Sequence, residues 1–371
     1  MGKIVVPRLL DERSEDGRHV VVIDDSMTLR LQKSSVLAER IVVSGFDDVP
    51  TTPEMIESRE LEKNLYEDPD HMASLMMRVG HQGLQLDGML NPTLKISPLA
   101  VTARRRVASG LLHKVELIEH SRILRGIRYT LKRFVQLLCR KVLRHFSKRQ
   151  TAIIITSVYP EVSVVCDVSH NTVFTWSELI GYLIIFWNAV NLRYRSFTAP
   201  AVRFKVVGIH QMTQEEDVFY IGPASPNVEG VATTRQFARR APVTKYGNPD
   251  MFMILTGCLQ WFVKMTLNIL LSCCHKGYGY TGEICGPLKV AIAEDKAGTY
   301  KGVHTAAHEA AHLLGVVHDG DGPAANIPGH PGAQRLGCAW ADGYMMSYVD
   351  NGPRFSRFSP CAQEQIRVTL K

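Results

Sequence analysis

The stretch from His304 to Asp319 constrains this chain more than any other part of it. It reads HTAAHEAAHLLGVVHD. His308 and His312 are four residues apart, so on a helix their side chains lie on one face, about one turn from each other. Two imidazoles at this spacing can bind one zinc ion. Glu309, next to the first of them, can act as a general base toward a water molecule held there.

The second half of the stretch supplies a third candidate ligand. Gly315 tolerates a positive φ, so the chain can turn sharply after the helix. That turn can bring His318 back toward the two helical histidines. Three nitrogen ligands leave a fourth position for water, which is the arrangement of a catalytic zinc site rather than a structural one.

Two alternatives to this site stay open. His304 lies four residues before His308, so these two histidines could be the helical ligand pair instead. That pair lacks a Glu and a Gly at the positions needed for a general base and for the turn. We therefore interpret His304 as a surface or supporting residue. The other alternative is a buried helix rich in Ala and Leu that carries histidines by chance.

Residues 308–318, HEAAHLLGVVH, resemble the zinc signature of the metzincin proteases. Metzincins also contain a Met-turn, and GYMMSY at 343–348 is similar to one. Met346 is the expected turn methionine and the hydrophobic floor of the site, although Met345 and Met346 could be ordinary core residues. Asp319 resembles the reprolysin or adamalysin branch. Segments 338–348 and 357–361 resemble the salivary reprolysin-like metalloproteases of ticks.

The resemblance implies an α/β fold, in which a metzincin catalytic domain with a mixed twisted sheet, a zinc helix and a Met-turn follows a β-rich prodomain. It implies a zinc-dependent endopeptidase that hydrolyses extracellular protein or peptide substrates, such as matrix or clotting proteins. The three histidines would hold one zinc ion, with Glu309 as the catalytic base. Asp319 is expected to bond within the lower subdomain and fix the turn. The alternative is a catalytically silent zinc-binding homologue that acts as a binding protein.

Composition and length allow two domains. The chain has 371 residues, of which 45% are apolar and 21% charged, as in globular proteins. Residues 1–103 contain short β-branched runs and resemble the prodomain of the tick enzymes, with an accessory β domain as the alternative. Residues 104–150 form a predicted basic linker. Residues 151–371 form the predicted catalytic domain.

The linker is the most basic part of the chain. Residues 104–149 contain 14 Lys and Arg against two Glu, in a chain with a net charge of +7. Apolar residues from Leu117 to Phe146 recur at helical spacing, which predicts an amphipathic helix. Such a helix could bind a membrane or nucleic acid. We prefer a solvated connection and expect neither partner.

Between the linker and the zinc helix the pattern alternates between strand and helix, which predicts a mixed α/β sheet with crossover connections. Residues 176–191 predict an amphipathic helix. GYGYTGEIC at 277–285 resembles the family's edge strand, which pairs with extended substrate; a Gly-rich loop is the alternative. The resemblance also allows a calcium ion at Glu161 and Asp250. The predicted strands are 159–167, 202–209, 250–257 and 288–295.

Residues 251–273 are apolar enough to suggest a membrane span. Lys264 disfavours one, because a charge near the bilayer centre costs about 2.5 kcal/mol or more. Within this stretch, 258–274 departs from the family, which has a shorter polar link there. We therefore prefer a core segment or an insertion to a span, and the resemblance does not extend to the upper rim of the cleft.

Eight cysteines permit four disulfides in a secreted protein, with reduced and buried thiols as the alternative. Cys338 and Cys361 resemble a reprolysin disulfide of similar spacing. Cys258 and Cys285 are a second candidate pair. The first residues, MGKIVVPR, do not resemble a signal peptide, whereas the family resemblance implies a secreted protein.

Overall fold

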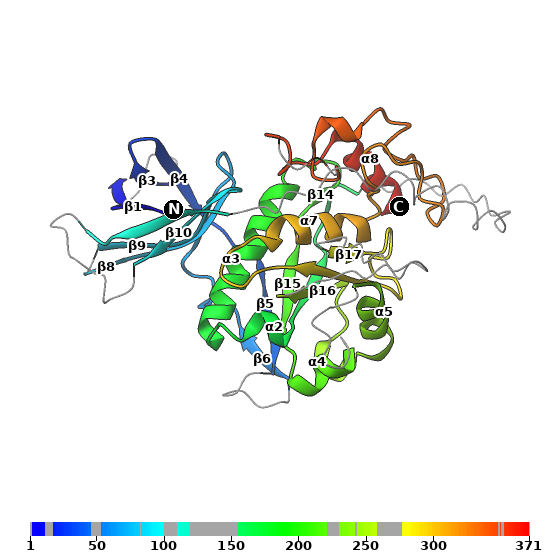
Figure 1. The fold of residues 1–371 in the computed structure, drawn as a ribbon, viewed down its shortest axis with the longest axis horizontal. Helices are drawn as coiled ribbons and strands as arrows, with labels where there is room; N and C mark the ends of the chain where they lie inside the picture. The colour runs from blue at the N-terminus through cyan, green and yellow to red at the C-terminus, as the bar shows by residue number, and fades with distance from the viewer. Residues whose placement is uncertain are drawn as a thin grey trace, which may run out of the picture.

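The computed structural model describes residues 2–11, 18–45, 53–81, 83–99, 110–118, 155–220, 230–241, 243–257, 277–347, 349 and 352–370. These residues form two large sheets, which lie side by side with helix α3 between them (Figure 1). The helices are α2 (Val168–Asn171), α3 (Trp176–Tyr194), α4 (Gln214–Tyr220), α5 (Gly230–Arg240), α6 (Val243–Tyr246), α7 (Gly302–Leu313), the 3-10 helix η2 (Trp340–Asp342) and α8 (Pro360–Thr369).

The first sheet is antiparallel throughout, and all its strands come from the N-terminal part of the chain, from Lys3 to Leu117. Its strand order is β1–β11–β10–β9–β8–β7–β4–β3–β2. The strands are β1 (Lys3–Val5), β2 (Arg8–Asp11), β3 (His19–Asp24), β4 (Met27–Lys33), β7 (Leu65–Asp68), β8 (Ala73–Gly80), β9 (Gly83–Asn91), β10 (Leu94–Pro98) and β11 (His113–Leu117).

The second sheet is mixed and has the order β17–β18–β16–β13–β15–β5–β6. Its inner pairs are parallel, and the two edge strands β17 and β6 run antiparallel to their neighbours. Two short parallel strands, β12 (Ser157–Val158) and β14 (Ala201–Val202), pair separately. The strands of the mixed sheet are β5 (Leu37–Ser44), β6 (Glu54–Glu57), β13 (Glu161–Cys166), β15 (Lys205–Gln211), β16 (Met251–Thr256), β17 (Gly277–Gly279) and β18 (Val290–Glu294).

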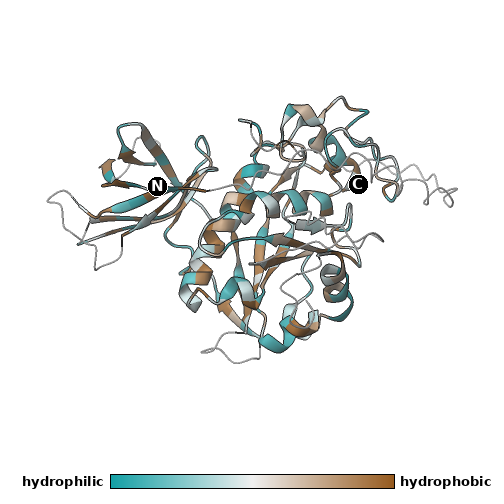
Figure 2. Cartoon of the chain, in the orientation of Figure 1, coloured by the Kyte–Doolittle hydropathy of each residue, from teal (hydrophilic) through white to brown (hydrophobic). Residues whose placement is uncertain are grey.

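The central strands are hydrophobic along their whole length because helices cover both faces of the sheet. All six residues of β16 are buried. Met253 packs in the cluster with α3 and α7, whereas its neighbour Ile254 packs in the cluster with Phe237 of α5. Figure 2 shows this concentration of hydrophobic residues in the strands at the centre of the sheet. The predicted α/β fold with a mixed sheet is confirmed.

Helix α3 is more buried than the sequence predicted. A capping interaction begins it: Glu178 accepts a hydrogen bond from the backbone N–H of Thr175 at 2.9 Å. All residues from Tyr182 to Tyr194 are buried. The predicted one-sided apolar face is therefore wrong for this part of the helix, because the N-terminal sheet covers the side that an isolated catalytic domain would expose to water.

Strand β5 belongs to the mixed sheet although it lies far upstream of the other strands in the sequence. It pairs in parallel with β15, with Val43 opposite Ile209. Ile41 and Val43 are buried in the same core as α3 and α7, and the Ser44 hydroxyl lies 2.8 Å from His210 Nδ1. Strands β5 and β6 thus extend the mixed sheet with residues from the region predicted to be prodomain-like.

Buried polar contacts join the N-terminal sheet to α3. Asn188, which is fully buried, donates to the Ser74 hydroxyl at 3.1 Å and accepts from the Ser34 hydroxyl at 2.7 Å. Arg195 donates to a carboxylate oxygen of Glu67 at 3.0 Å. Because the buried Asn188 amide is hydrogen-bonded to two residues of the N-terminal sheet region, these contacts favour one orientation of the sheet on α3.

Several expectations fall on residues 119–150 and 258–276, which lie outside the described residues. They concern most of the amphipathic helix predicted in the basic linker, the segment 258–274 that differs from the family, and most of the apolar stretch 251–273. Leu117, which the spacing assigned to a helix, is instead the last residue of strand β11. The first residues of 251–273 form strand β16. Among the described helices, none has the length and hydrophobicity needed to cross a membrane.

Candidate metal centre

Helix α7 carries three of the four predicted site residues, His308, Glu309 and His312. It ends at Leu313, just before the turn predicted at Gly315. Its apolar face, which includes Ala307 and Ala311, packs into the main core. Gly315 follows with a φ of 94°, and a Cβ atom there would also collide with the Thr369 hydroxyl of α8. The turn therefore needs glycine for its backbone conformation and for its contact with α8. Beyond it the chain returns to His318.

The three predicted ligands come together. His318 Nε2 lies 3.1 Å from His308 Nε2 and 3.3 Å from His312 Nε2. Tetrahedral zinc with Zn–N bonds of about 2.0–2.1 Å separates its ligand nitrogens by about 3.3–3.4 Å. Within the described parts of the chain, this is the one group of three His, Cys, Asp or Glu side chains with ligand atoms close enough to bind a common ion.

Hydrogen bonds fix which nitrogen of each helical histidine faces the centre. His308 Nδ1 lies 2.9 Å from the carbonyl oxygen of Met345, and His312 Nδ1 lies 2.7 Å from that of Val316. A carbonyl oxygen only accepts, so both Nδ1 atoms carry the proton and both Nε2 atoms present a lone pair. Lone pairs that converge at this distance repel unless a cation lies between them. The residues present therefore fit a zinc ion.

The third histidine is oriented by an acidic side chain. His318 Nδ1 lies 3.4 Å from a carboxylate oxygen of Asp321. A carboxylate beside the non-coordinating nitrogen favours the tautomer whose Nε2 binds metal and makes that nitrogen a stronger ligand. The sequence analysis did not identify Asp321. Its position three residues after His318 was the available signal.

Glu309 lies beneath the edge strand β17. Its side chain is 7% exposed, and burial raises the pKa of its carboxyl well above the usual range. A Cβ atom at Gly277 would lie 2.8 Å from Glu309 Oε1, and one at Gly279 would lie 2.8 Å from the Glu309 carbonyl oxygen. The two glycines thus allow β17 to pass directly over helix α7. In the sequence, glycine at every second position of Gly277-Tyr278-Gly279 was the feature that indicated this close approach.

Substituting Gly277 with alanine is expected to lower kcat/KM toward a protein substrate about 10- to 100-fold while zinc content stays unchanged. The added methyl group would lie 2.6 Å from Thr305 Cγ2 and 2.7 Å from Glu309 Cγ, so the Glu309 side chain would have to shift. If Glu309 is the general base, as predicted, a small displacement of its carboxylate strongly reduces the rate. Gly80→Ala is the matched control, because no atom lies within 4 Å of the position of its Cβ. Equal activity of Gly277→Ala and wild type would show that the carboxylate is not held by this contact.

The predicted Met-turn lies directly against the site. Met345 and Met346 are both fully buried. The Met345 carbonyl oxygen contacts His308, as described above, and the Met346 carbonyl oxygen accepts a hydrogen bond from the Asp319 N–H at 3.1 Å. Asp319 Oδ1 also accepts from the Ser359 hydroxyl at 2.6 Å, just before α8. Asp319 therefore fixes the turn after α7 by bonding to the segment that follows it, which agrees with the prediction. The role of Met346 as the hydrophobic floor of the metal site stays a prediction.

His304 does not join the metal group. Its ring lies against the ring of Phe355, with centroids 5.6 Å apart and an interplanar angle of 28°. This arrangement agrees with a supporting role for His304 rather than with the rival pair. The structure brings His308 together with His312 and His318 instead.

The cysteine predictions have different outcomes. Cys338 and Cys361 form a disulfide, as the resemblance implied. Cys285 is a free thiol that donates to Asp250 Oδ1 at 3.3 Å, so the candidate pair of Cys285 with Cys258 is not formed. Asp250 Oδ2 accepts from the Glu161 N–H at 2.9 Å. Both carboxylate oxygens of Asp250 thus have protein donors, and calcium binding there stays a prediction.

A buried network that the sequence analysis missed holds the start of α7. Asp295 accepts hydrogen bonds from the Gly302 N–H at 2.8 Å and from the Tyr182 hydroxyl at 2.6 Å. His170 Nε2 lies 2.9 Å from the same carboxylate, and both His170 and Asp295 are fully buried. No local spacing links these residues, because Asp295 lies more than one hundred residues after His170.

Comparisons with known proteins agree with this geometry. The profile Reprolysin_5, of metallo-peptidase family M12, matches residues 161–359. The chain is 26% identical over 381 residues to the venom metalloproteinase BumaMPs1 of Olivierus martensii, covering 99% of this chain and 90% of that protein. It is 32% identical over 178 residues to venom metalloproteinase 3 of Eulophus pennicornis, covering 45% of this chain and 41% of that protein.

A third relative is longer than this chain. A protein of Bombyx mori described as "A disintegrin and metalloproteinase with thrombospondin motifs like" is 29% identical over an alignment of 231 residues that covers 57% of this chain and 32% of that protein. This chain thus matches about a third of its length. The predicted closeness to tick enzymes stays a prediction. The family profile covers more than half of the chain and the whole metal centre, and the chain therefore belongs to the reprolysin-type metallopeptidases of family M12 and is a metalloendopeptidase.

Proposed function

We propose that this metalloendopeptidase hydrolyses extracellular proteins at a zinc ion held by His308, His312 and His318. Glu309 acts as the general base. The observation that carries the proposal is the convergence of three Nε2 atoms beside a buried carboxylate. Zinc bound there would supply a Lewis acid for a water molecule and for the carbonyl group of the scissile peptide bond.

A residue of the chain, Glu309, carries out both proton transfers of the reaction. Glu309 removes a proton from the attacking water and later delivers it to the leaving amine. Burial beneath β17 keeps bulk water away from this carboxylate, which favours transfer between the reacting atoms over exchange with solvent. The hydrogen bonds from His308 to Met345 and from His312 to Val316 keep both rings in one orientation throughout the reaction.

Strand β17 is the proposed binding site for the substrate backbone. It lies at the edge of the mixed sheet, and among the described strands only β18 pairs with it. An extended peptide can add to such an edge by main-chain hydrogen bonds, with little dependence on side-chain identity. This arrangement suits protein substrates in extended conformation, and matrix or clotting proteins are the substrate class that the family resemblance suggests.

Two features support an extracellular location. The disulfide between Cys338 and Cys361 is of a kind that persists in oxidising compartments. Two of the relatives above are described as venom metalloproteinases. We further propose that residues 1–103 act as a prodomain. The first cysteine of the chain is Cys139, so any latency would come from packing rather than from a thiol of that region bound to zinc.

Removal and return of the metal tests the function. The full chain is the protein to use, because β5 and β6 complete the sheet. We expect cleavage of a mixture of gelatin and fibrinogen by the zinc-loaded chain, at least about a 100-fold loss after treatment with a zinc chelator, and recovery on adding one equivalent of zinc. Zinc bound without cleavage would instead identify a silent binding protein.

A further inference from the structure

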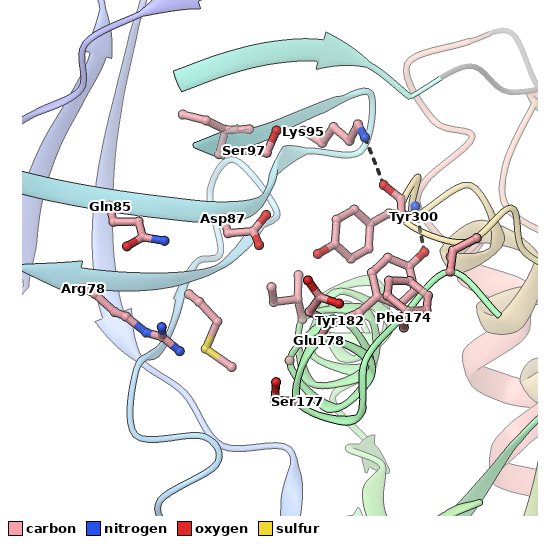
Figure 3. A pocket seen from close by; sticks show the side chains of 16 residues that line it. Arg78, Gln85, Asp87, Lys95, Ser97, Phe174, Ser177, Glu178, Tyr182 and Tyr300 are labelled. Atoms are coloured by element: carbon pink, nitrogen blue, oxygen red, sulfur yellow. Dashed lines mark hydrogen bonds between the residues drawn. The ribbon is translucent and has the colours of Figure 1, made fainter. Parts of the chain in front are cut away.

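The two ends of helix α7 are held by different side chains. At its start, Asp295 accepts hydrogen bonds from the Gly302 N–H and the Tyr182 hydroxyl. The Tyr182 hydroxyl accepts in turn from the Tyr300 N–H at 2.9 Å, as Figure 3 shows beside a cavity of about 460 Å³. Side chains of both charges line that cavity, so it favours no one class of charged ligand. At its other end, α7 leads into the turn toward His318, and a different side chain holds that turn.

This side chain is the buried imidazole of His330. Its Nε2 lies 2.8 Å from the Gly315 carbonyl oxygen. A carbonyl oxygen only accepts, so Nε2 carries the proton. The other ring nitrogen, Nδ1, accepts from the Ala324 N–H at 3.0 Å and from the Gly332 N–H at 3.2 Å. Backbone groups thus occupy both ring nitrogens, and burial lowers the pKa of His330, which favours the neutral ring.

The Gly315 carbonyl is a sensitive point of the turn. Glycine has no side chain to limit its backbone, and Gly315 has a φ of 94°. The peptide plane between Gly315 and Val316 is held at both ends. Its oxygen faces His330, and its N–H donates to the Ala311 carbonyl oxygen at 2.9 Å. The next carbonyl oxygen, that of Val316, lies 2.7 Å from His312 Nδ1. A rotation of the Gly315 peptide would therefore move the acceptor that orients His312.

The chain beyond His318 forms a closed loop, 322–332. Its two ends touch, since a Cβ atom at Gly332 would lie 2.6 Å from the carbonyl carbon of Gly322. Nδ1 of His330 binds N–H groups from both sides of this loop, whereas Nε2 binds the turn before His318. One side chain therefore holds the backbone on both sides of the third ligand.

We propose that His330 is a positioning residue of the metal centre, which holds the Gly315 turn so that His312 and His318 present their Nε2 atoms at zinc-binding distances. This inference rests on the proposed function, because it assumes a zinc ion at the three histidines. Groups that orient metal ligands contribute about 10- to 100-fold to metal affinity. His330 acts through the backbone of the turn, so we expect an effect at the lower end of that range.

The zinc affinity of the full chain, measured by competition with a chelating dye, tests the proposal without any need for cleavage. His330→Ala removes both contacts and is expected to weaken zinc binding about tenfold or more. Two conservative variants separate the contacts. The amide of His330→Gln can donate to the Gly315 oxygen from the place of Nε2, whereas that of His330→Asn lies in the place of Nδ1 and reaches only the loop. We expect glutamine to restore most of the affinity and asparagine to restore little.

His113 offers a matched control in the N-terminal sheet, because its ring makes the same kinds of contact. It is fully buried, its Nδ1 lies 3.0 Å from the Leu111 carbonyl oxygen, and its Nε2 accepts from the Leu86 N–H at 3.0 Å. His113→Ala is expected to lower the stability of the metal-free chain, as measured by denaturant unfolding, but to keep the zinc affinity of the wild type.

Wild-type zinc affinity in His330→Ala would overturn the proposal. Equal affinities of the glutamine and asparagine variants would do so too, since the Gly315 contact would then have no separate effect. If His113→Ala weakens zinc binding as much as His330→Ala, the loss reflects stability alone and the positioning role is refuted. Zinc binding by a wild type that cleaves nothing would contradict the proposed proteolysis alone, because the affinities decide the role of His330 without it.

Discussion

Replacing Glu309 with glutamine is expected to lower kcat/KM toward protein substrates by a factor of about 10² to 10⁴, the contribution typical of a positioned general base. Glutamine has nearly the same shape as glutamate, so β17 and the turn after α7 should keep their positions. It has no carboxylate to accept the proton of the attacking water. The variant should still bind one zinc ion, because its three histidines are unchanged.

The measurement combines cleavage rates with metal analysis of the same samples. His318→Ala is the companion variant, since it removes a ligand and should lose both zinc and activity. If Glu309→Gln cleaves substrate at the wild-type rate, Glu309 is not the base. A zinc-loaded wild type without activity would favour the silent homologue and would leave the difference between the variants unmeasurable.

Replacing Asp295 with alanine is expected to lower the free energy of unfolding by about 3–5 kcal/mol. The carboxylate is fully buried and accepts hydrogen bonds from the Gly302 N–H and the Tyr182 hydroxyl, with His170 Nε2 at 2.9 Å. Removing it leaves three polar groups buried without their partner. It also removes a negative charge from the N-terminus of α7, where the helix dipole favours one.

Denaturant unfolding of the zinc-loaded full chain measures this effect, with Asp25→Ala as the control. Asp25 lies in an exposed turn, so its removal should change stability by no more than about 0.5 kcal/mol. A similar small change for Asp295→Ala would mean that water replaces the lost carboxylate and that the network does not hold the helix.

The sequence was most informative where function depends on local spacing. His308 and His312 lie on one helical face in any regular helix, and Gly315 permits the turn that returns His318. The strands and helix predicted after residue 158 were also found, although α3 continues to Tyr194 and β17 ends at Gly279. Each of these elements is set by hydrophobic periodicity within a short window.

The sequence was least informative where residues meet across long separations. It predicted a one-sided apolar helix at α3, because the periodicity of one segment cannot reveal that a second sheet will cover its other face. It also could not show that β5 pairs with β15. A parallel strand pair needs a long connection, and many hydrophobic runs of similar composition could occupy that edge.

The sequence by itself therefore determined the zinc-binding helix, its turn and the family, since these depend on residues within a few positions of one another. Only the tertiary structure decided what surrounds them. It placed Asp295 beside His170 and the start of α7, and it brought Gly277 over Glu309. These contacts depend on how whole sheets and helices pack, and packing is fixed by the summed burial of many side chains rather than by any local pattern.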